Sequence, residues 1–210
     1  MKRLIALAAV VAMASFAYGQ IWDEHADGGG DAGDLPATAQ VPIGSGPLTT
    51  ITGLIEFEGS DADMYYIHID DPANFRAQTW PNSIIDTQLW LFDEDGIGIT
   101  FNDDDPSGAG GLQSTITGVF VPGPGNYYLV VSPYDWDAAN PAGLDIWQDS
   151  PYNVERAPDG PGAPGPVAMW GGLGWDYGAY QIDLQGVSYV PEPTSLALLA
   201  LGGLALLRRR

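Results

Sequence analysis

Aspartate offers most of the chemistry in this 210-residue chain. Carboxylate side chains recur at short spacing beside Gly, Asn and Pro. They are Asp61, Asp63, Asp70, Asp71, Asp86, Asp93, Asp95, Asp103, Asp104 and Asp105, with the amide of Asn102. Because Ca²⁺ takes about six to eight oxygen ligands in flexible geometry, acidic loops gathered at one edge of a fold suit it. The alternative is that these residues form turns, since an Asp side chain accepts hydrogen bonds from nearby backbone amides.

Other catalytic residue types are scarce. Cysteine is absent, and His25 and His68 are the two histidines. The sequence contains no G-x-S-x-G, H-E-x-x-H or Walker motif. The possibility of a glycosidase-type carboxylate pair gives no evidence for catalysis, because 27 acidic residues offer many such pairs by chance. We therefore expect a non-enzymatic protein, with a carboxylate-dependent, glycan-active enzyme as an alternative.

Aromatic residues are concentrated between residues 133 and 177, in a stretch rich in Pro and Gly. They are Tyr134, Trp136, Trp147, Tyr152, Trp170, Trp175 and Tyr177. Exposed rings on loops could stack on sugar rings and bind a polysaccharide. Buried rings would instead form a small secondary core that covers one end of the fold. The secondary core is the favoured interpretation.

The N-terminus has the pattern of a secretory signal peptide. Two basic residues precede an apolar run over residues 4–16, and Ala17-Tyr18-Gly19 places small residues where a signal peptidase reads them. We expect cleavage after Gly19, so that the mature chain begins at Gln20.

The C-terminus carries a second signal. Pro191-Glu192-Pro193 is followed by an uncharged apolar segment over residues 194–207 and by three terminal arginines. The segment is shorter than the ~20 residues that span a bilayer. It therefore favours transient contact with the inner membrane, and a permanent anchor is the alternative. The order of these parts resembles the PEP-CTERM sorting domain of exported bacterial proteins. That resemblance implies recognition and cleavage near the Pro-Glu-Pro sequence by the membrane peptidase exosortase.

Removal of both signals makes the protein strongly acidic. Residues 20–190 contain 26 acidic residues against Arg76 and Arg156, which gives a net charge near −24. Nucleic acid is excluded as a partner, because phosphate binding needs clustered Lys and Arg. Bound cations would relieve the self-repulsion. Without cysteine no disulfide can form, so stability must come from a core, which a bound metal could aid.

The elements that must position the acidic residues are β-strands. Short runs rich in β-branched and aromatic residues alternate with Gly, Pro, Asn and Asp. Strands are predicted over residues 48–57, 63–69, 74–80, 88–93, 97–102, 114–121, 126–132 and 179–187. About eight such strands predict an all-β fold, an antiparallel β-sandwich or jelly roll, with alternate residues such as Tyr65, Ile67, Leu89 and Leu91 buried between the sheets.

Five segments of this region resemble the bacterial pre-peptidase C-terminal (PPC) domain. The matching motifs are D-x-D-x-Y, D-x-x-L-x-L-[FY]-D-x-[DN]-G, an Asp-rich turn, G-x-Y-x-[LV]-x-V and G-x-Y-x-L. They stand here at Asp61–Tyr65, Asp86–Gly96, Asn102–Asp105 and Gly125–Val131, and in Gly178–Leu184, where Ile182 takes the place of the motif's Leu. The resemblance covers about residues 49–187 and implies a jelly-roll-like accessory module. Two features depart from it, since no peptidase domain accompanies the module and the Trp-rich stretch is unusually long.

The same resemblance implies a metal site. Some PPC-like domains in collagenases bind calcium, which implies Ca²⁺ ligands here at Asp61, Asp63, Asp86, Asp103 and Asp104. This set has the same alternative as the acidic turns in general, namely that the residues serve as turn formers only.

The sequence therefore predicts four regions. They are a signal peptide over 1–19, a flexible acidic leader over 20–47, a PPC-like sandwich over 48–189 and a sorting tail over 190–210, with a helix expected in the signal peptide and a short apolar helix in the tail. The expected function is a non-enzymatic component of the cell surface, outer membrane or extracellular matrix. Its expected partners are signal peptidase, exosortase and an extracellular polysaccharide. A calcium-dependent carbohydrate-binding module is the second hypothesis.

Overall fold

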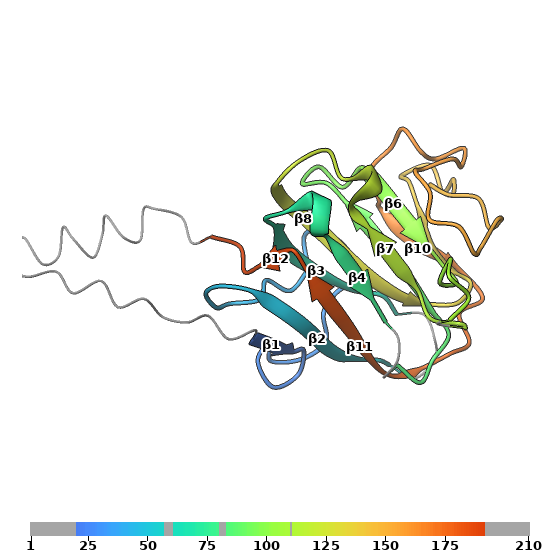
Figure 1. The fold of residues 1–210 in the computed structure, drawn as a ribbon. Coiled ribbons are helices and arrows are strands. Elements are labelled where there is room, and N and C mark those ends of the chain that lie inside the picture. Colours follow the sequence, from blue (N-terminus) through green and yellow to red (C-terminus); the bar gives the residue numbers. More distant parts are fainter. Residues whose placement is uncertain (1–19, 57–60, 80–82, 110, 192–210) are drawn as a thin grey trace, which may run out of the picture.

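The computed structural model describes residues 20–56, 61–79, 83–109 and 111–191 as a β-sandwich. Two five-stranded sheets face each other, as the sequence predicts, and a two-stranded ribbon lies beside them (Figure 1). The first sheet has the order β1 (Gln20–Asp23), β2 (Leu48–Ile55), β11 (Gly178–Gln185), β4 (Arg76–Gln78) and β7 (Thr115–Thr117). The second has the order β12 (Val187–Ser188), β3 (Asp63–Ile69), β8 (Gly125–Pro133), β5 (Thr87–Phe92) and β6 (Gly98–Asn102). The ribbon pairs β9 (Trp136–Ala139) with β10 (Met169–Gly172).

The strand predictions are largely confirmed, with differences at Gly residues. β3 has the predicted bounds, and the strand expected from residue 114 gives way to a short 3₁₀ helix, η2 (Gly118–Phe120). A second 3₁₀ helix, η1 (Pro72–Asn74), precedes β4. The single strand expected over 179–187 is broken at Gly186, whose φ of 70° is readily adopted by glycine and strained for other residues. This break sends β11 and β12 to different sheets.

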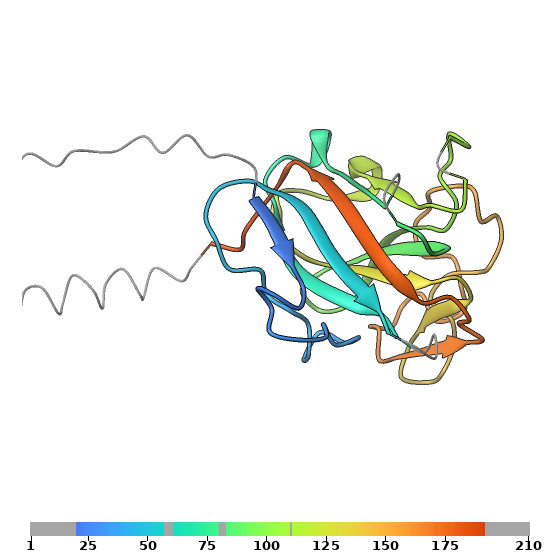
Figure 2. The same ribbon diagram turned by 90° about the horizontal axis from the view of Figure 1, so that it is seen from below.

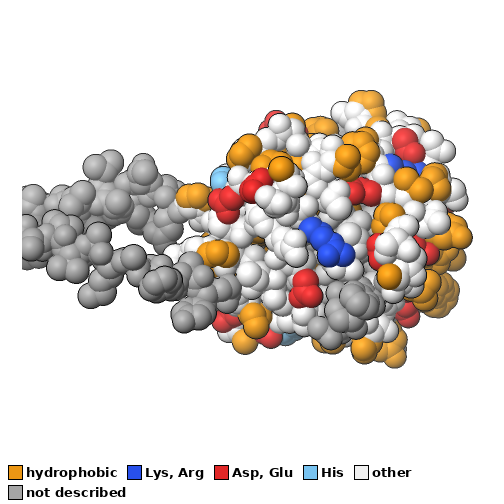
Figure 3. All heavy atoms as spheres, in the orientation of Figure 1, with side chains coloured by type: hydrophobic (Ala, Val, Ile, Leu, Met, Phe, Trp, Pro, Cys, Tyr) orange, Lys and Arg blue, Asp and Glu red, His pale blue; other side chains and the backbone are white. Residues whose placement is uncertain are grey.

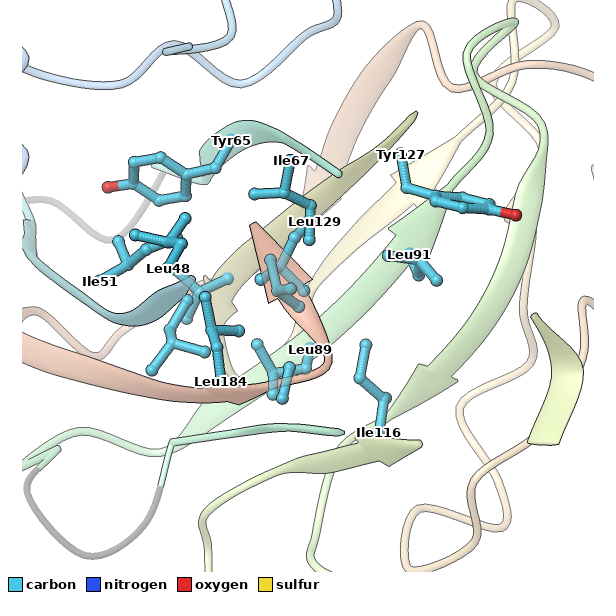
Figure 4. Packing of buried hydrophobic residues seen from close by; sticks show 14 of the residues in the cluster. Leu48, Ile51, Tyr65, Ile67, Leu89, Leu91, Ile116, Tyr127, Leu129 and Leu184 are labelled. Carbon is cyan, nitrogen blue, oxygen red and sulfur yellow. The ribbon is translucent and has the colours of Figure 1, made fainter. Parts of the chain in front are cut away.

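The main core fills the space between the two sheets. Tyr65, Ile67, Leu89 and Leu91, the alternate residues predicted to point inward, are all fully buried in it (Figure 4). Residues such as Ile51 and Leu184 meet them from the first sheet. The period-two alternation of side chains in β3 and β5 therefore holds on this face.

A second core lies on the outer face of β5, under the Trp-rich stretch. Every residue of β5 is buried, because Trp90 and Phe92 point away from the main core into a second cluster. Trp147 and Trp170 complete it, with the Trp147 ring 5.4 Å from that of Trp90 and the Trp170 ring 5.5 Å from it. The prediction of a secondary core is confirmed for these two tryptophans.

Residues 20–47, expected to form a flexible leader, lie against the sandwich instead. β1 pairs in parallel with β2, an exception to the antiparallel arrangement that was predicted (Figure 2). Trp22 is 6% exposed, and its indole Nε1 donates to Gln40 Oε1 at 2.9 Å. Gln40 also bonds through its backbone to Met64 and Tyr66 on β3. The burial of Trp22 and these bonds hold the segment against the sandwich. The many Gly and Pro residues of the segment did not indicate this attachment.

The helices predicted for the signal peptide and for the tail lie outside the described residues. Within the described ranges, no helix is long and apolar enough to cross a membrane.

Candidate functional site

The fold gathers the acidic side chains into two separate clusters. We call Glu24, Asp31 and Asp63 the Glu24 cluster, and Asp86, Asp103 and Asp104 the Asp86 cluster. In each, one oxygen atom per carboxylate lies within 4.8 Å of the others. Of the five predicted ligands, Asp86, Asp103 and Asp104 thus come together, whereas Asp63 belongs to the other group.

Asp61 lies beside the Glu24 cluster and caps the backbone. Its Oδ2 accepts a hydrogen bond from the Glu56 amide at 2.7 Å. Burial, and to a smaller extent the nearby carboxylates, raise the pKa of Asp61 to about 6. At least one carboxylate oxygen of Asp61 therefore accepts a backbone hydrogen bond, as the turn-forming alternative expects.

Glu24 follows β1 and is fully buried. Its Oε1 accepts from the Ala32 amide at 2.8 Å, and its Oε2 accepts from the Leu54 amide at 2.9 Å. One carboxylate thus joins the loop after β1 to strand β2. Glu24 and Asp31 were not among the predicted ligands because they fall in the segment interpreted as a leader. The signal that could have found them is the dense acidic run that begins at Asp23.

Asp63 opens β3 and points into the core on the same side as Tyr65. It is fully buried, and within the described part of the chain neither carboxylate oxygen makes a hydrogen bond of normal geometry. Burial, together with the charges of Glu24 and Asp61, raises the pKa of Asp63 well above its ordinary value. A buried, unpaired carboxylate is costly, so this position favours either a bound proton or a bound cation.

The Asp86 cluster forms where β5 begins and β6 ends. These two strands are antiparallel with Leu89 opposite Asn102, so the residue before β5 and the two residues after β6 lie close together. Asp103 is 5% exposed, and within the described residues its Oδ1 and that of Asp86 are buried without a hydrogen-bond partner. Burial first, and the neighbouring carboxylates second, raise the pKa of Asp103 to about 8 and that of Asp86 to about 6.

Both clusters lie towards the same end of the second sheet. Asp63 and Leu89 are each paired with Val131, from opposite sides of β8. Each cluster concentrates three carboxylates, and among the described residues at least one buried oxygen in each accepts no hydrogen bond of normal geometry. That is the donor set that Ca²⁺ prefers, since carboxylate, carbonyl and water oxygens at about 2.3–2.6 Å complete its shell.

The aromatic residues of the Trp-rich stretch fall into two groups. Trp147 and Trp170 are buried in the second core, and Trp136 is partly buried against it. A second group is exposed by about half or more. It consists of Tyr134, Tyr152, Trp175 and Tyr177.

The predicted processing sites lie at the edges of the described region. Gln20 is the first residue of β1, so the described part of the chain begins at the residue that cleavage after Gly19 would leave as the new N-terminus. Pro191 is described, whereas Gly19, Glu192, Pro193 and the apolar run 194–207 lie outside the described residues.

The fold and its two clusters define an acidic, all-β sandwich. Residues 190–210 match the PEP-CTERM protein-sorting motif. This motif implies an exported protein that exosortase sorts and that is associated with the cell surface. No curated protein matches the chain.

Proposed function

We propose that this protein is a non-enzymatic component of the cell surface or extracellular matrix. The observation that carries the proposal is the sorting motif, which follows directly on the sandwich: β12 ends at Ser188 and the motif begins at residue 190. A single folded β-sandwich is thus delivered by the tail, and the PPC-like identity of the sandwich is part of the proposal.

The Glu24 cluster supports a structural role for its acids. Glu24 directs both carboxylate oxygens to backbone amides, and Asp63 is closed off from solvent. Acids placed in this way hold the fold and do not face a substrate. We propose that Ca²⁺ binds here between Glu24, Asp31 and Asp63, with Asp61 beside it, and offsets the repulsion among these carboxylates.

Processing and location in the native host test the proposal. Intact-mass analysis should show a chain that begins at Gln20 and lacks the three terminal arginines, recovered from the cell surface or the matrix. Replacement of Pro191-Glu192-Pro193 by alanines should leave precursor in the membrane fraction. An unprocessed C-terminus on most molecules, or normal release of the alanine variant, would contradict sorting through this motif.

The absence of enzymatic activity has its own test. Purified protein incubated with calcium and a panel of polysaccharides should produce no reducing ends above a heat-denatured control. Turnover that is lost in Asp103→Asn, a variant that keeps the side-chain shape, would overturn the non-enzymatic assignment.

A further inference from the structure

Four exposed aromatic residues belong to chain segments that contact the Asp86 cluster. Their exposed fractions are 53% for Tyr134, 53% for Tyr152, 77% for Trp175 and 52% for Tyr177. Such large rings usually bury most of their surface, as Trp147 and Trp170 do in the same stretch.

Hydrogen bonds connect this aromatic group to the aspartates themselves. The Tyr134 amide donates to the Asp86 carbonyl at 3.0 Å, and the Asp104 amide donates to the Tyr152 carbonyl at 3.1 Å. The Asp86 amide donates to Asp176 Oδ2 at 2.9 Å, and Asp176 lies between Trp175 and Tyr177 in the sequence. The exposed rings therefore come from three chain segments that meet at this cluster.

The cluster lies at the end of the sandwich away from the sorting tail. Val187 pairs with Ile69 at the end of β3, whereas Asp63 opens the same strand at the level of β5 and the Asp86 cluster. A seven-residue strand is about 20 Å long. In Figure 3, apolar side chains, coloured orange, are scattered over the visible face, and several lie at its right-hand end. A protein held by its C-terminal segment would direct this end outward.

We propose that the Asp86 cluster is a calcium-dependent binding site for a neutral polysaccharide. Asp86, Asp103 and Asp104 hold the ion, vicinal hydroxyl groups of the glycan complete its oxygen shell, and the exposed rings pack against the sugar faces. This inference rests on the proposed function, because it names the matrix component that the surface protein contacts.

Charge supports a neutral glycan over an anionic one. Residues 20–190 carry a net charge near −24, and Asp137 and Asp176 add negative charge beside the cluster. An anionic polymer is repelled by this surface, whereas hydroxyl groups can bind the ion without adding charge.

Affinity electrophoresis and a glycan array test the site. The probes are mannan and galactan as neutral polymers, alginate as the anionic comparison, and an array of bacterial matrix polysaccharides, each with millimolar calcium or with EDTA. A neutral polymer should retard the protein in calcium and not in EDTA. Absence of calcium-dependent binding to every neutral probe, or preferential binding of alginate, would overturn the proposal.

Matched variants separate the ion from the rings. Asp103→Asn should abolish calcium-dependent binding, and Trp175→Ala should weaken it about tenfold, the effect of removing one central ring from an interface. Ile43→Ala is the control, since Ile43 is a 76% exposed apolar side chain next to Gly44, which lies against Tyr189 near the sorting tail, and this variant should bind normally. Because Trp175 is exposed, its variant should fold normally, which near-ultraviolet circular dichroism checks.

The outcomes distinguish failure of the proposed binding site from failure of the proposed function. Correct processing and surface location without glycan binding would refute the site alone. Binding that persists in EDTA and in Asp103→Asn would show a site without calcium and would also refute it. Full loss of binding in Asp63→Asn with retained folding would move the site to the Glu24 cluster.

Discussion

The hydroxyl oxygens of Tyr65 and Tyr180 lie 2.5 Å apart and join the two sheets inside the main core. Tyr65 belongs to β3 in the second sheet, and Tyr180 belongs to β11 in the first. Both rings are almost fully buried, and burial raises the pKa of each phenol well above its ordinary value. The pair is therefore a neutral polar contact between the sheets, close to the buried carboxylates of Asp63 and Glu24.

Loss of one hydroxyl from this pair should destabilise the fold. Tyr180→Phe leaves the Tyr65 hydroxyl buried without its partner, which costs about 1–3 kcal/mol of unfolding free energy. Tyr152→Phe is the control, because Tyr152 is exposed. Urea unfolding followed by tryptophan fluorescence measures both. Equal stability of the two variants would show that the tyrosine pair contributes nothing to sheet docking.

The Trp-rich stretch should unfold together with the sandwich. Trp147 is 3% exposed, its Nε1 donates to the Arg156 carbonyl at 3.2 Å, and its ring meets those of Trp90 and Phe92. Trp147→Ala should cost about 3–5 kcal/mol, the usual range for a buried aromatic residue.

Trp175→Ala, the matched truncation of an exposed tryptophan, should change stability by less than about 0.5 kcal/mol. Differential scanning calorimetry distinguishes these outcomes. A separate, early transition in Trp147→Ala with an unchanged main peak would show that the stretch is an independent unit.

The sequence predicts the strands well where one face is buried and the ends carry turn residues. β3 meets both conditions, because its alternate residues Tyr65 and Ile67 fill the main core and Asp and Gly flank it. β1, β9 and β10 were missed because each has four residues, too few to show a period. Burial of Trp22 through parallel pairing with β2 depends on a partner strand 25 or more residues away, which no local pattern encodes.

The sequence predicted four of the six clustered acidic residues and did not predict how the six divide into two groups. Asp86, Asp103 and Asp104 flank two strands that pair as a hairpin, so their proximity follows from local topology. Glu24 and Asp63 are 39 positions apart and meet because the segment after β1 folds back over the sheet, a contact set by tertiary packing. The division into two clusters is therefore a property of the fold.

The metal-free protein should lose stability as the pH rises. Burial raises the pKa of Asp137 to about 6 and that of Asp103 to about 8, above their ordinary value of 3.8. The folded state then holds protons that the unfolded chain releases, so the free energy of unfolding falls between about pH 4 and about pH 8. Urea midpoints in EDTA across this range measure the effect. A midpoint that rises towards the alkaline end would contradict the raised pKa values.

Calcium should stabilise the fold, and each cluster should contribute separately. An ion that binds only the folded state adds about 2.7 kcal/mol at a hundredfold excess over its Kd. Millimolar Ca²⁺ should therefore raise the melting temperature more than Mg²⁺ or NaCl of equal ionic strength. Asp63→Asn and Asp103→Asn should each remove part of this gain, and the double variant should remove most of it.

The same variants should have the opposite effect when calcium is absent. Asn has nearly the shape of Asp without its charge, so Asp63→Asn removes a buried, unpaired carboxylate and should keep or raise the melting temperature in EDTA. Asp95→Asn is the control, because Asp95 is exposed in the turn between β5 and β6 and should change neither measurement. If Asp63→Asn and Asp103→Asn respond to calcium as the parent does, the ion binds elsewhere and these two aspartates are not its ligands.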